Sequence, residues 1–423
     1  MPGTFVIAGG GLAAAKAAEA LRAEGFDGAI VLVGREPHLP YERPPLSKGY
    51  LQGGDERQKI FVHDADWYRD HAVDLRTGVT VTGIDPAAHQ VTLSEGERLR
   101  YDKLLLATGA TPRRLAVPGG DRGNVLYLRT VDDCDRLRAT LSATLSATLS
   151  ATLSAALSAA GRVAVIGAGW IGLETAAAAR AAGVEVTVIE QERQPLLGAL
   201  GPEIGAVFAA LHRDHGVDLR LGARLAEITE TGVRLADGTH IDADAVVAGI
   251  GAVPDTELAA AAGLTIDNGI KTTADLRTSN PDIFAAGDVA NAYHPRLGRH
   301  VRVEHWANAL NQPAVAARAM LGRKAVYDEP PYFYTDQYDL GMEYLGHVPP
   351  GVSHDVVIRG DVAGREFLAF WLRDDDTVAA AMNVNIWDQG DQLKALVLAD
   401  SPVDRGALAD PAVPLDGLVR SGG

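Results

Sequence analysis

The sequence predicts an α/β protein with two Rossmann-like dinucleotide-binding domains and a smaller C-terminal α+β domain. Two segments, which begin at Thr4 and Arg162, carry most of this prediction. Each has a short apolar strand, a Gly-rich turn, a helix-forming stretch that ends at Gly, and a second apolar strand. Such βαβ units place parallel, buried strands beside a crossover helix. From about Ala325 the chain becomes aromatic and β-rich, which predicts an antiparallel sheet.

Length, charge and cysteine content narrow the class of protein. The 423 residues exceed one compact domain, so we expect two or three. Acidic residues outnumber basic ones by 55 to 39, and the net charge of −16 argues against nucleic acid as the main partner. The single cysteine, Cys134, excludes a disulfide framework, a cysteine-based metal site and a dithiol redox centre within the chain. The N-terminus shows no charged-then-apolar leader, so we expect a soluble, cytoplasmic protein.

We expect three domains with the following boundaries. We expect the first dinucleotide-binding domain to be discontinuous, with residues 1–112 and 253–325. The second covers 113–252, where short alternating strands flank a turn at Asp237-Gly238. The C-terminal domain covers 326–423.

Residues 139–160 are of low complexity, with four copies of Ala-Thr-Leu-Ser followed by Ala-Ala-Leu-Ser-Ala-Ala. The leucines recur every fourth residue, so their stripe drifts by about 40° per repeat around a helix. Nine of the 22 residues are Ser or Thr, which is too polar for confident membrane insertion. We therefore expect a lengthened surface helix that leads into the second βαβ unit.

The first Gly-rich turn has the pattern G-x-G-x-x-A at Gly9, Gly11 and Ala14. Glycines permit a tight corner and a close backbone approach to a pyrophosphate, and the helix N-terminus supplies unpaired N–H groups. An acidic residue is expected at the end of the second strand, where it binds ribose hydroxyls. Glu36 is the available carboxylate there, and Arg35 precedes it.

The second turn carries the full G-x-G-x-x-G pattern at Gly167, Gly169 and Gly172, and its second strand ends at Glu190. A carboxylate at that position accepts ribose hydroxyls and repels a 2′-phosphate, so NADH is favoured over NADPH. The nearby Arg193 keeps NADPH open as an alternative. Two dinucleotide sites in one chain predict hydride exchange between cofactors, with a flavin as the tightly held one.

Five further motifs occur together and in order: PYERPPLSKGYL (40–51), LLLATGATPR (104–113), YLRT (127–130), TSNPDIFAAGDVA (278–290) and VRVEHWANALNQ (301–312). With the two turns, they resemble the FAD-dependent, NADH-linked ferredoxin reductases of bacterial oxygenase and cytochrome P450 systems, such as the putidaredoxin and biphenyl dioxygenase reductases. Rubredoxin reductase and apoptosis-inducing factor are relatives of that family. The resemblance covers nearly the whole chain except the Ala-Thr-Leu-Ser repeat.

The resemblance implies that the first domain binds FAD and the second binds NADH. The positions that match FAD-binding positions of the family are Gly9, Gly11, Leu12, Ala13, Arg35, Glu36, Arg43, Lys48, Val81, Ala107, Thr108, Arg129, Asp288, Val289, Glu304 and Trp306. The positions expected to bind NADH are Gly167, Gly169, Ile171, Gly172, Glu190 and Gly251. Arg35 stands where the family usually has an acidic residue, so we expect Glu36 to make the ribose contact. Asp288 is expected to bind the ribitol. Its structural alternative is to cap a following helix, and both roles can hold.

Three residues are expected to act in the chemistry: Lys48, Glu174 and Trp306. By resemblance, Lys48 lies near N5 of the flavin, where positive charge stabilises the reduced ring. Glu174 is its expected partner, and Trp306 contacts the flavin ring. The structural alternatives are a solvated loop lysine for Lys48 and a helix carboxylate favoured by the dipole for Glu174.

Three other positions stay open at this point. Tyr334 matches a family position where an aromatic ring lies between flavin and surface, although core packing is an equal alternative. Glu304 and His305 either approach the flavin or form a structural pair. No metal site is expected.

Disulfide reductases among the relatives carry a redox cysteine just before the position of Lys48. Residues 44–47 here read Pro-Pro-Leu-Ser, and Cys134 is far away in sequence. The resemblance therefore implies that electrons pass singly from the flavin to an external acceptor.

The sequence thus predicts an NADH:ferredoxin oxidoreductase that passes electrons through FAD to a [2Fe–2S] ferredoxin, which feeds a cytochrome P450 or a ring-hydroxylating oxygenase. An acidic ferredoxin needs a basic docking patch, which Arg296, Arg299, His300 and Arg302 could supply. Rubredoxin reductase and NADH oxidase are the alternative activities. A redox sensor similar to apoptosis-inducing factor is a third alternative.

Overall fold

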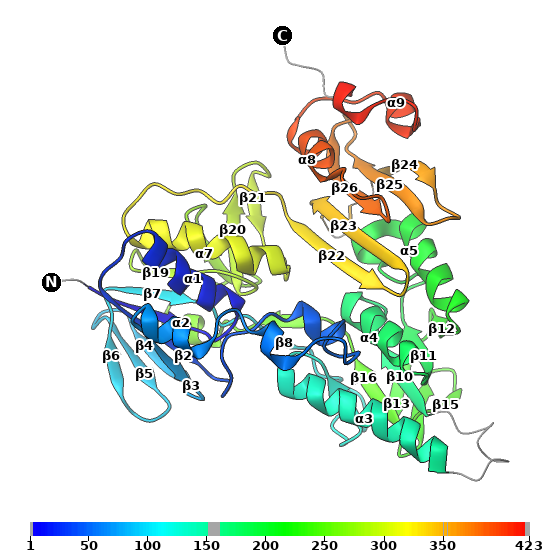
Figure 1. Ribbon diagram of the computed structural model, residues 1–423, viewed down its shortest axis with the longest axis horizontal. Coiled ribbons are helices and arrows are strands. Elements are labelled where there is room, and N and C mark those ends of the chain that lie inside the picture. The colour runs from blue at the N-terminus through cyan, green and yellow to red at the C-terminus, as the bar shows by residue number, and fades with distance from the viewer. Residues whose placement is uncertain (1–2, 151–160, 350, 353, 419–423) are drawn as a thin grey trace. The chain divides into compact units, whose positions relative to one another are not determined.

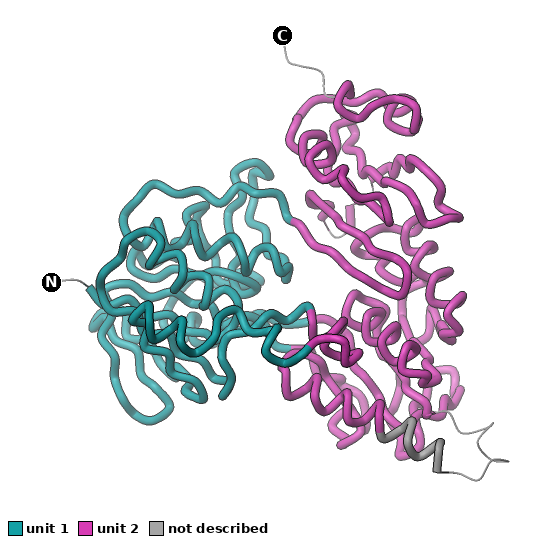
Figure 2. The backbone as a smooth tube through the Cα atoms, in the orientation of Figure 1, with its two compact units in different colours: residues 1–44, 56–111, 252–331 teal, residues 45–55, 112–251, 332–423 magenta. Residues whose placement is uncertain are grey.

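The computed structural model describes residues 3–150, 161–349, 351–352 and 354–418 (Figure 1). The chain forms two compact units (Figure 2). The first unit consists of Met1–Pro44, Glu56–Thr111 and Ala252–Pro331, and the second of Pro45–Asp55, Pro112–Gly251 and Tyr332–Gly423. The division into three domains with the boundaries given above stays a prediction.

A five-stranded parallel sheet forms the core of the first unit, in the order β19-β7-β1-β2-β3. Its strands are β1 (Thr4–Ala8), β2 (Ala29–Gly34), β3 (Val73–Thr77), β7 (Lys103–Leu106) and β19 (Ile283–Ala285). The central strands are buried on both faces, as their unbroken apolar runs predict. The parallel pairing of β1 with β2 confirms the first βαβ unit.

Smaller elements complete the first unit. The other strands are β4 (Val81–Asp85), β5 (Gln90–Leu93), β6 (Arg98–Arg100), β8 (Ala110–Pro112), β17 (Ala252–Pro254), β18 (Ile270–Thr272), β20 (Ala290–His294) and β21 (Arg299–Val301). The helices are α1 (Leu12–Ala23), α2 (Ala65–Asp70), α6 (Glu257–Ala261) and α7 (Trp306–Met320), with a 3₁₀ turn at Arg57–Ile60. Buried alanines of α1 and α7 lie in one hydrophobic cluster, because small side chains let two helices approach closely.

The second unit repeats the parallel arrangement, in the order β12-β11-β10-β16-β9. These strands are β9 (Val125–Tyr127), β10 (Arg162–Ile166), β11 (Glu185–Glu190), β12 (Asp218–Leu221) and β16 (Ala245–Ala248). An antiparallel sheet of β13 (Leu225–Ile228), β14 (Gly232–Leu235) and β15 (His240–Asp242) follows β12. The expected turn at Asp237-Gly238 joins β14 to β15. The helices are α3 (Val131–Ser150), α4 (Trp170–Ala181) and α5 (Leu197–Asp214), with a 3₁₀ turn at Pro44–Ser47.

A third sheet in this unit is antiparallel, as the aromatic C-terminal segments predict, with the order β22-β23-β26-β25-β24. Its strands are β22 (Tyr332–Gln337), β23 (Leu340–Gly346), β24 (Asp355–Asp361), β25 (Glu366–Leu372) and β26 (Val378–Val384). Two helices, α8 (Gly390–Leu398) and α9 (Arg405–Ala409), and a 3₁₀ turn at Leu415–Gly417 follow it. Buried leucines of these helices cover one face of the sheet.

The Ala-Thr-Leu-Ser repeat is helical as far as the structure describes it, because α3 continues through its first three copies to Ser150. The rest of the predicted helix, residues 151–160, lies outside the described residues. Among the described helices, none is long and apolar enough to cross a membrane.

Candidate functional site

The predicted site residues fall into two groups, one in each unit. In the first unit, the group centres on the N-terminus of α1, which starts directly after Gly11. The first turn of α1 is fully described and has no acidic residue. A Cβ at Gly9 would lie 2.1 Å from the carbonyl oxygen of Ala107, and one at Gly11 would lie 2.9 Å from Nη1 of Arg43. Only glycine therefore fits at Gly9, whereas at Gly11 the Arg43 guanidinium would have to move. The positive end of α1 at this turn is suited to bind an anion.

Other predicted FAD residues close around the same turn. A Cβ at Gly287 would lie 3.2 Å from the Cβ of Ala13, so the segment with Asp288 lies beside the start of α1. The hydroxyl of Thr108 donates a hydrogen bond to the carbonyl of Asp255, over 2.8 Å. Leu12, Ala13, Ala107 and Val289 are buried, whereas Val81 is half-buried at the start of β4. The charge and shape of this turn fit the pyrophosphate of a dinucleotide.

Glu36 and Arg35 occupy different environments at the end of β2. The Glu36 carboxylate accepts hydrogen bonds from the hydroxyl of Tyr41 and from Nη2 of Arg43, the latter over 3.0 Å. The Arg35 side chain is 67% exposed, with its Nη2 3.8 Å from a carboxylate oxygen of Asp255. Glu36 is thus the residue at the end of β2 whose carboxylate is held in place by hydrogen bonds. The sequence did not identify Tyr41 as a partner of Glu36.

One expectation for Asp288 is wrong. Asp288 does not cap a helix, because the segment that follows is the strand β20. The helix that packs here is α7, and Gln312 of α7 accepts a hydrogen bond from the backbone N–H of Gly287 over 2.8 Å. The binding of the ribitol by Asp288 stays a prediction.

The segment before α7 forms its own polar contacts. Nη1 of Arg302 lies 2.7 Å from a carboxylate oxygen of Glu304, and the Arg302 side chain is only 11% exposed. Trp306 begins α7, and its indole N–H donates to the carboxylate of Glu42 over 3.2 Å. Glu304 therefore pairs with Arg302, and the low exposure of Arg302 leaves it little part in the predicted basic patch.

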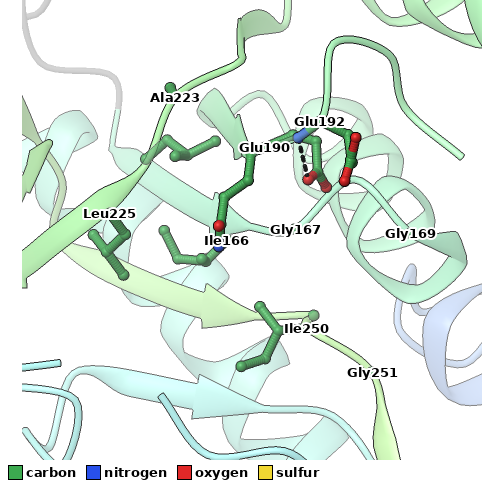
Figure 3. Close-up of a pocket in the computed structure, with 12 residues that line it drawn as sticks. Ile166, Gly167, Gly169, Glu190, Glu192, Ala223, Leu225, Ile250 and Gly251 are labelled. Carbon is green, nitrogen blue, oxygen red and sulfur yellow. Dashed lines mark hydrogen bonds between the residues drawn. The ribbon is translucent and has the colours of Figure 1, made fainter. Parts of the chain in front are cut away.

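In the second unit, a pocket of about 410 Å³ opens beside the second Gly-rich turn (Figure 3). It is lined by Ile166, Gly167, Gly169, Ile189, Glu190, Gln191, Glu192, Ala223, Leu225, Gly249, Ile250 and Gly251. Like α1, α4 begins directly after a glycine of its turn and has no acidic residue in its described first turn. The pocket therefore joins an anion-binding helix end to the carboxylate of Glu190, which are the two features a dinucleotide requires.

Four of the six residues predicted to bind NADH line this pocket, and the other two lie next to it on α4. Gly172 lets the start of α4 pack closely against the Gly-rich turn, because a Cβ there would lie 2.1 Å from the carbonyl oxygen of Gly167. Ile171 is 42% exposed. Sequence spacing identified the turn correctly but not which of its residues face the pocket.

Lys48 and Glu174, which are 126 positions apart, meet in the second unit. Nζ of Lys48 lies 2.7 Å from Oε1 of Glu174, whose side chain is 4% exposed. The Lys48 ammonium also lies 5.3 Å from the ring centre of Tyr334. Ser47 and Thr335 donate further hydrogen bonds to the Glu174 carboxylate. The solvated-lysine alternative therefore does not describe Lys48, and the Glu174 carboxylate has three side-chain donors in addition to its place near the start of α4.

Ser47 and Thr335 are missing from the predicted set. The only available signal for Ser47 was its place next to Lys48, and Thr335 gave none. Arg129, predicted beside the FAD, also lies in the second unit, where its backbone N–H donates to Asp133 over 3.2 Å.

Residues 3–313 match the family model described as pyridine nucleotide-disulphide oxidoreductase, and residues 332–419 match the one described as reductase C-terminal. The chain belongs to the pyridine nucleotide-disulphide oxidoreductase family. Membership confirms the predicted fold class, the oxidoreductase activity and the cofactors FAD and NADH.

Two curated relatives of this oxidoreductase match it over nearly its whole length. It is 43% identical to the anthranilate 1,2-dioxygenase system ferredoxin–NAD(+) reductase component of Burkholderia cepacia. The matched region covers 97% of this chain and 98% of the relative. It is 37% identical to putidaredoxin reductase of Pseudomonas putida, over 98% and 96% of the two chains. The crystal structure of the covalent putidaredoxin reductase–putidaredoxin complex matches with a TM-score of 0.90, 35% identity and 99% coverage of both chains.

The cysteine of this oxidoreductase lies closer to Lys48 than its sequence position suggests. Cys134 is fully buried on α3, and its thiol donates to the carbonyl of Leu46 over 3.2 Å. Distance in the sequence therefore did not mean distance in the fold, although the inference that no thiol takes part in the electron transfer is not contradicted. Burial raises the pKa of the Cys134 thiol to about 12, so the group stays protonated and does not form a reactive thiolate.

Proposed function

We propose that this oxidoreductase passes electrons from NADH through FAD to a [2Fe–2S] ferredoxin, which in turn feeds a cytochrome P450 or a ring-hydroxylating oxygenase in the cytoplasm. Both curated relatives described above carry names of ferredoxin- or putidaredoxin-linked reductases. The observation that carries the cofactor part is the second-unit pocket, which is lined by both the Gly-rich turn and Glu190 (Figure 3).

We assign FAD to the first unit and NADH to the second. The start of α1, the Glu36 carboxylate and the Arg43 guanidinium would hold the pyrophosphate and ribose of FAD. The start of α4 and Glu190 would hold the same groups of NADH. When bound, FAD accepts a hydride from NADH and returns the two electrons one at a time.

Lys48 and Glu174 are the side chains to which we assign a role in the chemistry. Glu174 holds the Lys48 ammonium at a fixed place, since the carboxylate also accepts hydrogen bonds from the hydroxyls of Ser47 and Thr335. A fixed positive charge favours a flavin that gains negative charge on reduction. Nothing in this arrangement requires a thiolate, in agreement with the protonated Cys134.

The acceptor is tested by NADH oxidation with cytochrome c as reporter, with and without a [2Fe–2S] ferredoxin. Strong dependence on the ferredoxin is expected. Equal rates without it, together with peroxide formation, would instead indicate an NADH oxidase. A high rate with rubredoxin and a low one with ferredoxin would reassign the acceptor.

A further inference from the structure

A buried chain of polar side chains extends from Glu174 into the interior of the second unit. Thr335 of β22 donates from Oγ1 to Oε1 of Glu174 over 2.6 Å, the same oxygen that accepts from Lys48. Nε2 of Gln337 lies 3.1 Å from the Thr335 oxygen. The Gln337 carbonyl oxygen lies 2.9 Å from Nε2 of His212, which comes from α5. Thr335, Gln337 and His212 are all fully buried.

The chemistry of these groups sets one direction for every hydrogen bond. A carboxylate only accepts, so the Thr335 hydroxyl donates to Glu174 and its oxygen accepts from the Gln337 amide. The Gln337 carbonyl then accepts from Nε2–H of His212. Burial lowers the pKa of His212 to about 4, which leaves the imidazole neutral, with a single N–H, at physiological pH. The hydroxyl of Tyr338 lies 3.4 Å from the other ring nitrogen, Nδ1.

The buried polar side chains of Gln337 and His212 are not needed to fill the core beside α5. The buried residues of α5 are otherwise mainly apolar, including Leu200, Ile204, Phe208 and Leu211. Burying Gln337 and His212 costs free energy unless every polar atom is satisfied. On α4, by contrast, the hydroxyl of Thr175 directly after Glu174 is buried with no hydrogen-bond partner in the described structure. The side chains of Thr335, Gln337 and His212, in contrast, each have a hydrogen-bond partner in the chain that leads to Glu174.

We propose that Thr335, Gln337 and His212 form a positioning relay that holds the Glu174 carboxylate and, through it, the Lys48 ammonium. The relay rests on the function proposed above, in which Lys48 and Glu174 assist flavin reduction. It gives the C-terminal sheet a part in that step, since two of its three members belong to β22. None of the three is a catalytic residue, because each acts only through Glu174.

A double-mutant cycle tests the relay through the rate at which NADH bleaches the flavin in anaerobic stopped flow. Thr335→Val keeps the side-chain shape and removes the hydroxyl, and we expect about tenfold slower reduction, the size of one lost hydrogen bond to a charged group. Gln337→Leu should slow it several-fold. Because Gln337 acts through Thr335, the double variant should be no slower than Thr335→Val alone. The relay would be overturned if the double variant were slowed by the product of the two single effects. A wild-type rate in Thr335→Val would also overturn it.

Two controls separate positioning from damage to the fold. Thr175→Val makes the same change one residue from Glu174, at a hydroxyl without a partner, and should leave the rate unchanged. Thr335→Ser keeps the hydroxyl and should restore most of the rate. Each variant is compared at equal FAD content and with the same circular dichroism spectrum.

A second readout does not depend on turnover. The ¹⁵Nζ resonance of Lys48, assigned by its loss in Lys48→Arg, should move in Thr335→Val and in Gln337→Leu but not in Thr175→Val. An unmoved resonance in both relay variants would refute the relay even if NADH reduces the flavin normally. If NADH fails to bleach wild-type flavin, the proposed function fails, and this resonance still decides whether the relay exists.

Discussion

The backbone N–H of Ala168, inside the second Gly-rich turn, donates a hydrogen bond to Oε2 of Glu190 over 2.6 Å. The backbone N–H of Glu192 donates to the other carboxylate oxygen over 2.9 Å (Figure 3). Both oxygens are thus held by the backbone at the end of β11. A carboxylate fixed in this way presents its remaining lone pairs to the pocket in one orientation.

Replacing this carboxylate should weaken the choice of NADH over NADPH. In Glu190→Ala, we expect the ratio of kcat/KM for NADH to that for NADPH to fall at least about tenfold, the size of one lost charge-assisted contact. Steady-state kinetics with both cofactors measure the ratio. The matched control is Glu185→Ala, which removes an exposed carboxylate at the start of the same strand, β11. An unchanged ratio in Glu190→Ala would place ribose recognition elsewhere.

Removing the Lys48 ammonium should slow flavin reduction while FAD stays bound. We expect Lys48→Ala to lower the rate about 100-fold, as is typical when a preorganised charge is removed. Stopped-flow absorbance gives the rate, and the visible spectrum after gel filtration gives the FAD content. Lys59→Ala, at an exposed lysine, is the control. A full rate in Lys48→Ala would leave the Lys48–Glu174 pair a purely structural role.

Charge reversal on the hairpin between β20 and β21 should weaken ferredoxin docking. Arg296 is half-exposed, with its Nε 3.4 Å from the carboxylate of Asp328, and Arg299 begins β21. In the variant with Arg296→Glu and Arg299→Glu, the KM for an acidic ferredoxin should rise and its dependence on salt should flatten. Arg98→Glu, at another exposed arginine, should leave both unchanged. An unaltered salt dependence in the double variant would exclude the patch.

His212 should make the protein sensitive to acid. The pKa of His212 is about 4 in the folded chain and about 6.5 when unfolded, so the unfolded state binds more protons between these values. Stability therefore falls as the pH drops below about 6.5, by about 2 kcal/mol at pH 5. His212→Gln should be less stable at pH 7 yet lose less melting temperature between pH 7 and pH 5.

Structural features that depend on residues close together in the sequence could be predicted best. Each Gly-rich turn depends on glycines within six positions and on the strand and helix beside them, so both βαβ units could be recognised. The partners of Glu174 show the limit, since Thr335 lies 161 positions away and a threonine in a strand has no pattern of its own. Cys134 and Leu46 are 88 positions apart and yet in contact, because sequence separation carries no information about packing. Asp288 was misjudged because an Asp after a strand precedes helices and strands alike.

The buried state of Cys134 has a practical consequence for spectroscopy. A thiol that is fully buried and has a pKa near 12 reacts slowly with maleimides and methanethiosulfonates at neutral pH. Cysteines introduced at exposed positions of each unit would therefore take up dyes or spin labels on an almost silent background. The native chain could keep its thiol, and distances between the two units could be measured during turnover without first building a cysteine-free variant.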